Sequence, residues 1–519
     1  MRVRRVAWCF ALRKGASFVA VVALGLGLAS PASTAASVSF DTAAKSTKLA
    51  VAALHDIGST VGDGLSAAKT SDGANVRHIL HFSDVHLNIS KSHSERESAE
   101  IPVAYGNDAP MRLLVSALAY AKTVLPDPDL FLYTGDHVVR GELTDEYLAE
   151  VIEKNVKTMA EYYNVSDSGK MTGITAVVGN ADTNPSYNMT ITDPAIEENP
   201  EIASIAGAWQ DSLSQTNLEW LKRRGYLAYT LGDNLTVLTL NTVPYSPDHV
   251  PDTSSVLDPF EQFAWLNASL AGLRSAGKYA YIVGHIPPVV DSFGGSPMWN
   301  ETYIRTYKNI VCQYSDIIKT QLFGHVHSVE FRLPLARGLD SLLHRDGVLV
   351  ADEEKDSSDL VPLFMVAAIS PIFSSNPAFM VWDYDHTTYD LLDFTVHGGN
   401  ISSLDGTVDW QPLFKASQEY GVSTLRASEI ARFAARTATD ARLLERYYFN
   451  SKAQSHLQPS CLDVSCQAKW QCSLYWWSTV RVVVTTAFVL LTSTMRRRGG
   501  VQESSKLLQR QRVIVASMA

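Results

Sequence analysis

The chain has 519 residues, of which 46% are apolar, and it carries a formal net charge of -10 at pH 7. A chain of this length and composition is able to bury a large core, so we expect one main domain with smaller attachments. The negative charge argues against a protein that binds nucleic-acid duplexes through their phosphate backbone.

The N-terminus shows the three-part pattern of a secretory signal peptide. An apolar run extends from Phe18 to Ala29 and is followed by small residues up to Ala36. The basic residues before the run are Arg2, Arg4, Arg5, Arg13 and Lys14. We therefore predict a signal peptide over residues 1–36 and an alanine- and serine-rich leader over residues 37–75. An uncleaved membrane anchor is the alternative, because the basic residues begin so early.

Sequons for N-glycosylation agree with a secretory route. Seven Asn-x-Ser/Thr sequons lie at Asn88, Asn164, Asn188, Asn234, Asn267, Asn300 and Asn400. The predicted location is therefore the secretory pathway, with the extracellular space, a lysosomal or vacuolar lumen, or the cell surface as destination.

Five apolar segments rich in β-branched or aromatic residues each end shortly before a histidine, an aspartate or an asparagine. The segments are Val76–Phe82, Leu130–Tyr133, Ile174–Val178, Tyr279–Val283 and Ile317–Phe323. The polar residues that follow them are Asp84, His86, Asp136, Asn180, His285, His325 and His327. Such segments predict strands, and side chains at strand ends collect at the ligand-binding edge of open α/β sheets. The seven residues are therefore predicted to meet in one site.

These residue types suit a pair of divalent metal ions. A carboxylate offers two oxygens, so Asp136 suits the position shared by both ions. Asp84 and His86 stand two residues apart at a strand end and point the same way, and His325 and His327 repeat that spacing. Two ions clamp the attacking and leaving oxygens of a phosphoryl group, and a hydroxide bridging them is a nucleophile at neutral pH. A single Asp-x-His or Gly-His occurs by chance in many chains, but five ordered blocks predict a metal site.

The C-terminal part contains a helical pattern and a cluster of cysteines. Apolar residues at helical spacing between Phe414 and Tyr448 predict a helical subdomain that caps the sheet, over residues 401–473. Removal of the signal peptide with Cys9 leaves four cysteines, which allow two disulfides and three pairings in an oxidising compartment. They are Cys312, Cys461, Cys466 and Cys472. A zinc knuckle is the alternative for the cluster, although no histidine stands at finger spacing beyond it.

A strongly apolar run, Leu474 to Thr494, follows the cysteines and precedes three arginines. Aromatic residues at its start and the basic stop after it favour a transmembrane helix over residues 474–495, with a basic tail over residues 496–519. Arg481 lies near one end of the run, where a long side chain reaches the membrane interface. The alternative is a buried terminal helix of the main domain.

The polar blocks resemble those of the calcineurin-like metallophosphoesterases, and more narrowly those of the acid sphingomyelinase branch. The similarity runs from about Val76 to about Tyr420. Further similar stretches are Tyr105–Pro110, Leu240–Tyr245, Ile282–Pro288, Ser370–Pro371 and Asn376–Phe379. The resemblance implies a four-layer α/β/β/α metallophosphoesterase sandwich over residues 76–400, together with the C-terminal helical subdomain.

The same resemblance implies a ligand set for two divalent metal ions. One ion would be held by Asp84, His86, Asp136 and His327, and the other by Asp136, Asn180, His285 and His325. Ligands of these types suit zinc, which we predict, and also manganese and iron.

The surroundings of the ligands depart from the family pattern. Family members carry a histidine after the metal-binding asparagine, and the sphingomyelinases carry another four residues after the bridging aspartate; here these positions hold Ala181 and Arg140. Arg140 is predicted to bind a phosphoryl oxygen, but arginine does not act as a general acid near neutral pH. His137 is the remaining candidate acid, although its position beside Asp136 gives it a different direction and favours a supporting or solvated role.

The resemblance therefore predicts a metal-dependent phosphodiesterase of the sphingomyelinase-like kind, in which a metal-bridging hydroxide attacks phosphorus. Without a histidine acid, departure of an alkoxide is impaired, whereas a phosphoanhydride leaves with less help. An endopolyphosphatase-like hydrolase is thus one alternative, and a metal-binding pseudoenzyme is another. Phospholipids, nucleotides and polyphosphate are the candidate substrates, and the C-terminal helix is the candidate membrane contact. The leader contains no cysteine, which excludes the disulfide-rich saposin module of acid sphingomyelinases from it.

Overall fold

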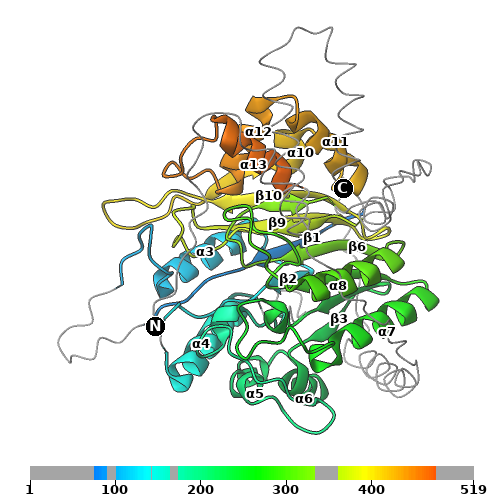
Figure 1. The fold of residues 1–519 in the computed structure, drawn as a ribbon. Helices are drawn as coiled ribbons and strands as arrows, with labels where there is room; N and C mark the ends of the chain where they lie inside the picture. The colour runs from blue at the N-terminus through cyan, green and yellow to red at the C-terminus, as the bar shows by residue number, and fades with distance from the viewer. Residues whose placement is uncertain (1–74, 90–100, 142, 164–172, 334–360, 475–519) are drawn as a thin grey trace, which may run out of the picture. The chain divides into compact units, whose positions relative to one another are not determined.

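The computed structural model describes residues 75–89, 101–141, 143–163, 173–333 and 361–474 (Figure 1). All of them belong to the second of two compact units, Ser46–Ala519. The predicted signal peptide, nearly all of the leader, Asn164 and the run from residue 475 onward lie outside the described residues. Within those residues, no helix combines the length and apolar character that crossing a membrane requires.

Two mixed sheets form the centre of the fold. The first has the order β11-β10-β9-β1-β2, with β1 at Val76–Phe82, β2 at Leu130–Tyr133, β9 at Ala378–Asp385, β10 at Leu391–Gly398 and β11 at Gln411–Lys415. The second has the order β3-β4-β5-β6-β8-β7, with β3 at Leu227–Leu231, β4 at Leu235–Thr239, β5 at Tyr279–Gly284, β6 at Ile318–Phe323, β7 at Glu330–Arg332 and β8 at Leu363–Met365. Because β1 runs parallel to β2 and β5 runs parallel to β6, the carboxyl ends within each pair lie side by side.

Successive residues of the central strands pack into two different cores. Leu80 of β1 and Ile282 of β5 belong to one core, which also contains residues of the flanking helices. Their sequence neighbours, Ile79 and Tyr281, belong to the other, which joins the two sheets. Strands alternate their side chains between two faces, so one core lies beneath the flanking helices and the other lies between the sheets, where residues from Ala416 onward join it. The predicted layered α/β architecture is confirmed.

Helices cover the outer faces of the sheets (Figure 1). The helices that precede β6 in the chain are α3 (Met111–Val124), α4 (Asp145–Tyr163), α5 (Pro200–Ala206), α6 (Gln215–Arg224), α7 (Gln262–Ser275) and α8 (Glu301–Gln313). The C-terminal helices are α10 (Ala416–Tyr420), α11 (Ala427–Thr437), α12 (Ala441–Ser451) and α13 (Val464–Ser473). Short 3₁₀ turns lie at η3 (Asn180–Asp182), η4 (Gly207–Trp209), η5 (Val243–Tyr245) and η6 (Pro259–Glu261).

Four of the five predicted strands are present, but the segment Ile174–Val178 is not a strand. Ile174 forms only an isolated bridge with Phe131. The hydroxyl of Thr175 accepts a hydrogen bond from the backbone N–H of Tyr133 and donates one to its carbonyl, at 2.8 and 2.9 Å. A side chain therefore takes the backbone groups that a β ladder would use. The segment still lies beside β2, so Asn180 reaches the same edge as the other predicted ligands.

The predicted helical pattern near the C-terminus is confirmed from Ala416 onward, and its first residues form β11 instead. The four C-terminal helices lie against the sheet that contains β9 and β10 (Figure 1). Tyr420, Phe433 and Tyr447 contact one another with ring centroids 4.8 to 5.9 Å apart, which joins three of these helices.

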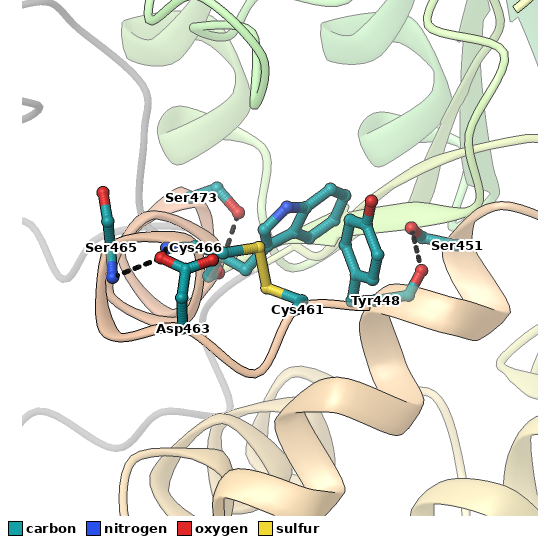
Figure 2. The surroundings of a disulfide bond; sticks show 8 residues. Tyr448, Ser451, Cys461, Asp463, Ser465, Cys466 and Ser473 are labelled. Carbon is teal, nitrogen blue, oxygen red and sulfur yellow. Dashed lines mark hydrogen bonds between the residues drawn. A yellow bond between two sulfur atoms is a disulfide. The ribbon is translucent and has the colours of Figure 1, made fainter. Parts of the chain in front are cut away.

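A disulfide joins Cys461 to Cys466 beside α13 (Figure 2). The zinc-knuckle alternative is therefore wrong for these two residues, because a disulfide leaves no thiolate for a metal. Next to it, the rings of Tyr448 and Trp470 meet edge to face at 5.0 Å.

Removal of this disulfide is expected to have a modest effect on stability. The cysteines are five positions apart, and chain entropy assigns about 2 kcal/mol to so short a loop. The double variant Cys461→Ser with Cys466→Ser should lower the free energy of unfolding by no more than that, measured by urea denaturation with oxidised wild type as reference. A much larger loss would show that the bond organises α12 and α13.

Candidate metal centre

The structure brings all seven predicted residues together at the strand ends. Two groups of side chains form there, Asp84 with His86 and His327, and Asp136 with His285 and His325. Within each group the candidate ligand atoms lie within 4.8 Å of one another. The oxygen of Asn180 lies 3.1 Å from Nε2 of His285, which adds the seventh residue to the second group.

Asp136 lies between the two groups. Its Oδ2 is 3.2 Å from Nε2 of His86 and 3.3 Å from Nε2 of His285. This oxygen is buried and accepts no hydrogen bond from the described residues. The other oxygen, Oδ1, accepts the backbone N–H of Ala181 at 2.8 Å. One oxygen is thus fixed by the backbone, and the other faces both groups.

The nitrogen atoms of the histidines also converge. Nε2 of His86 is 3.2 Å from Nε2 of His327, and Nε2 of His285 is 3.2 Å from Nδ1 of His325. Neutral imidazole lone pairs at this distance repel unless a proton or a cation lies between them. The donor set of histidine nitrogens, carboxylate oxygens and an amide oxygen therefore fits two divalent ions.

Backbone carbonyls fix the orientation of two rings. The Nδ1 atom of His86 lies 2.9 Å from the carbonyl of Val138, and that of His285 lies 2.7 Å from the carbonyl of Thr134. When Nδ1 donates its proton to a carbonyl, Nε2 carries the lone pair that a metal ion requires. Both rings therefore present Nε2 to the centre.

Asp182 holds the two loops that carry Asp136 and Asn180. Its carboxylate accepts backbone N–H bonds from Asp136, His137 and Gly179 at 2.6 to 2.9 Å. Burial, and then the nearby charge of Asp136, raises the pKa of Asp182 to about 7. Sequence reasoning missed the role of Asp182.

Burial and nearby charges shift the pKa values of two histidines in the second group. Burial lowers the pKa of His285, but the charge and hydrogen bond of Asp136, together with Asp84 and the carbonyl of Thr134, outweigh that effect and raise it to about 9. Burial, and then the charge of His285, lowers the pKa of His325 to about 3, so its ring is neutral. A neutral ring keeps a lone pair free for a metal ion.

The backbone is strained at most of these positions. Five of the seven residues have φ between 47° and 72°, and they are Asp84, His86, Asp136, His325 and His327. Residues other than glycine adopt this left-handed region rarely, and each costs on the order of 1–3 kcal/mol. Such strain clusters at functional sites, where it directs side chains that an ordinary strand end would spread apart.

Gly179 makes the close approach of the two loops possible. A Cβ atom at this position would lie 2.2 Å from Oδ1 and 2.3 Å from the backbone nitrogen of Asp136. No side chain fits that space without displacing Asp136.

Arg140 lies at the centre, as predicted. Its Nη2 is 2.9 Å from Nε2 of His327, and its Nη1 donates to Oδ1 of Asp108 at 3.1 Å. Ser370 donates to the same oxygen at 3.0 Å. The guanidinium also lies 5.2 Å from the ring centre of Phe373, which is 55% exposed. Sequence reasoning missed the roles of Asp108 and Phe373.

His137 does not face the centre, which corrects the expectation that it acts as an acid. Its ring is wholly buried between Tyr133 and Trp209, at centroid distances of 4.2 and 5.3 Å. Nδ1 accepts a hydrogen bond from Asn155 at 3.1 Å, and burial lowers the pKa of His137 to about 3. A neutral, enclosed ring has no path to a substrate oxygen, so its role is structural.

Tyr187 is a further residue that sequence reasoning missed. Its backbone N–H donates to the carbonyl of Asn180 at 3.0 Å, and its φ is 67°. Burial raises the pKa of Tyr187, the charges of Asp136 and Asp248 add to the rise, and Arg140 opposes it. The phenol therefore lies in the electric field of the centre.

Comparisons with known proteins agree with this geometry. Residues 77–329 match the family model of the calcineurin-like phosphoesterases. The chain is 25% identical over 434 residues to acid sphingomyelinase-like phosphodiesterase 3b of Mus musculus, covering 78% of this chain and 88% of that protein. It is 26% identical over 398 residues to sphingomyelinase phosphodiesterase C of Dictyostelium discoideum, covering 74% and 83%.

A third relative is named for a different phosphodiester. The chain is 24% identical over 413 residues to a cyclic GMP-AMP phosphodiesterase of Homo sapiens, covering 76% of this chain and 84% of that protein. Residues 77–329, which carry all seven candidate ligands, therefore match the calcineurin-like phosphoesterases in sequence and place those ligands in two groups that could each hold a metal ion.

Proposed function

We propose that the protein is a phosphodiesterase in which Asp136 is shared between two divalent ions. The observation that carries this proposal is the position of Asp136 Oδ2, which is buried, unpartnered among the described residues and within 3.3 Å of His86 and His285. The first ion would be held by Asp84, His86, Asp136 and His327. The second would be held by Asp136, Asn180, His285 and His325. When bound, the ions activate water and neutralise charge on the phosphoryl oxygens.

The chain's own residues would bind and orient the phosphate. Arg140 offers two N–H groups in a planar fork, which matches phosphoryl oxygens. Asp108 positions that fork beside His327. Zinc is the proposed metal, because four of the seven ligands are imidazoles.

The proposed substrate class rests on the names of the relatives and on the missing imidazole acid. The relatives' names indicate sphingomyelin or cyclic GMP-AMP as phosphodiester substrates, and we propose a substrate of this class. A phosphoanhydride such as polyphosphate is the second candidate, because Ala181 and the buried His137 supply no imidazole acid within the part of the chain that the structure describes. The Cys461–Cys466 disulfide supports a secretory location, since such bonds persist in oxidising compartments.

Two esters that share a phosphocholine head test the function. The purified full-length protein, loaded with zinc, should hydrolyse p-nitrophenyl phosphocholine, and sphingomyelin more slowly. Tripolyphosphate, assayed in parallel, tests the anhydride alternative. Bound metal with no turnover on any of the three would contradict the proposal and favour the pseudoenzyme.

Metal removal is expected to destabilise the protein. Chelation leaves buried carboxylates and imidazoles converging without cations, whereas ions bound at 100 times their Kd add about 2.7 kcal/mol per site. The melting temperature should fall after dialysis against chelator and recover when zinc is added, measured by calorimetry. Magnesium serves as the control cation, since it prefers oxygen ligands and should restore less. An unchanged melting temperature would contradict the assignment of these seven residues as ligands.

A further inference from the structure

Neither Arg140 nor His137 supplies a neutral hydrogen-bond donor for the departing oxygen. Arg140 is a cation bound to Asp108, and His137 is enclosed between aromatic rings. Cleavage of a phosphodiester places negative charge on the ester oxygen, and the charge is largest when the alcohol is a weak acid. A donor beside the metals would stabilise that charge.

The loop from Asn180 to Tyr187 returns to its own beginning. The carbonyl of Asn180 accepts three hydrogen bonds, from the hydroxyl of Thr183 at 3.1 Å, the hydroxyl of Ser186 at 2.9 Å and the backbone N–H of Tyr187 at 3.0 Å. The side chain of Asn180 in turn donates to Ser186 at 3.2 Å. Position 187 is therefore fixed next to a proposed metal ligand.

The conformation of Tyr187 is costly and is held from both sides. Its φ of 67° is rare for a bulky residue, yet its carbonyl accepts the N–H of Val250 at 3.0 Å while its own N–H is bound to Asn180. A tyrosine kept in this region by two backbone bonds marks a site where the fold accepts strain to place a side chain.

The phenolic hydroxyl of Tyr187 is accessible, since it is not among the enclosed unpartnered atoms of the described residues. The side chain is partly buried, and among the described residues its oxygen makes no hydrogen bond. It interacts electrostatically with Asp136, which faces both proposed ions, and with Arg140. A phenol that is open and makes no hydrogen bond within the described residues keeps its donor free, so a ligand atom bound near Asp136 and Arg140 can accept it.

We propose that Tyr187 is a catalytic residue whose hydroxyl donates a hydrogen bond to the leaving-group oxygen. This inference rests on the proposed phosphodiesterase function. In the reaction the oxygen of water bonds to phosphorus, and the bond from phosphorus to the ester oxygen breaks. The phenol keeps its proton and stabilises the charge on the departing oxygen, which then takes a proton from solvent.

Removal of the hydroxyl alone tests the proposal. Tyr187→Phe and wild type are compared on p-nitrophenyl phosphocholine and on phenyl phosphocholine, which differ only in the acidity of the leaving phenol. We expect kcat/KM to fall on the order of 10²-fold for the phenyl ester and no more than about threefold for the nitrophenyl ester. Metal content per chain should stay unchanged.

Tyr120→Phe is the matched control. Tyr120 lies on α3, its hydroxyl contacts His397 at 3.3 Å, and its loss should change neither rate. Equal losses on both esters, or no loss on either, would overturn the role of Tyr187 while wild-type turnover keeps the proposed function intact. Wild type that is inactive on both esters would overturn the function and this inference together.

Discussion

Asp136→Asn is expected to lower kcat/KM for p-nitrophenyl phosphocholine by about 10³-fold and to release metal from the purified protein. The substitution keeps the size of the side chain and the acceptor for the N–H of Ala181, but removes the negative charge between His86 and His285. A neutral amide cannot compensate the charge of two divalent ions in a buried site. Turnover and metal content by elemental analysis measure both effects.

Asp405→Asn is the control for this experiment. Asp405 lies in an exposed loop, where its carboxylate accepts the N–H of Thr407. Its replacement should leave turnover and metal content unchanged. An Asp136→Asn protein that keeps both metals and more than a tenth of the wild-type rate would contradict the bridging assignment.

Gly179→Ala is expected to reduce kcat/KM by about 10²-fold without altering a single ligand. The new methyl group would meet Oδ1 and the backbone nitrogen of Asp136, at 2.2 and 2.3 Å, so the aspartate must move. A displacement of this kind costs about 10²-fold in rate, and overpacking a buried site costs about 1–3 kcal/mol of stability. Kinetics and thermal unfolding measure the two losses separately.

A second glycine in the same segment provides the control. A Cβ atom at Gly173 would meet nothing within 4 Å. Gly173→Ala should therefore keep wild-type kinetics. Normal activity in Gly179→Ala would show that the two loops separate easily, and that their contact does not position Asp136.

The strands and ligand positions were predictable because local pattern and tertiary burial agree. The strands β2 and β5 consist mainly of buried apolar residues, and β1 becomes buried toward its carboxyl end. The segment Ile174–Val178 has the same composition but is not a strand, because the hydroxyl of Thr175 bonds to Tyr133. A side chain that competes with the backbone is not visible in a hydrophobic pattern.

Residues that support the ligands were harder to predict, because their partners are distant in the chain. Asp108 and Arg140 are 32 positions apart, and Phe373 contacts His327 with a centroid distance of 4.9 Å. His137 illustrates the opposite error. Its place beside Asp136 suggested an acid, but α4 contributes Asn155 to its ring and encloses it.

The ligands of the centre come from opposite ends of the domain in sequence. His86 follows β1 and His327 follows β6, and 241 positions separate them. The strands β1 and β6 belong to different sheets, so the two sheets must associate before either group of ligands is complete. A nascent chain that has emerged only as far as β5 lacks the histidines of the last block. Uptake of metal therefore follows the late, long-range steps of folding, and bound metal would report that biogenesis of the domain is complete.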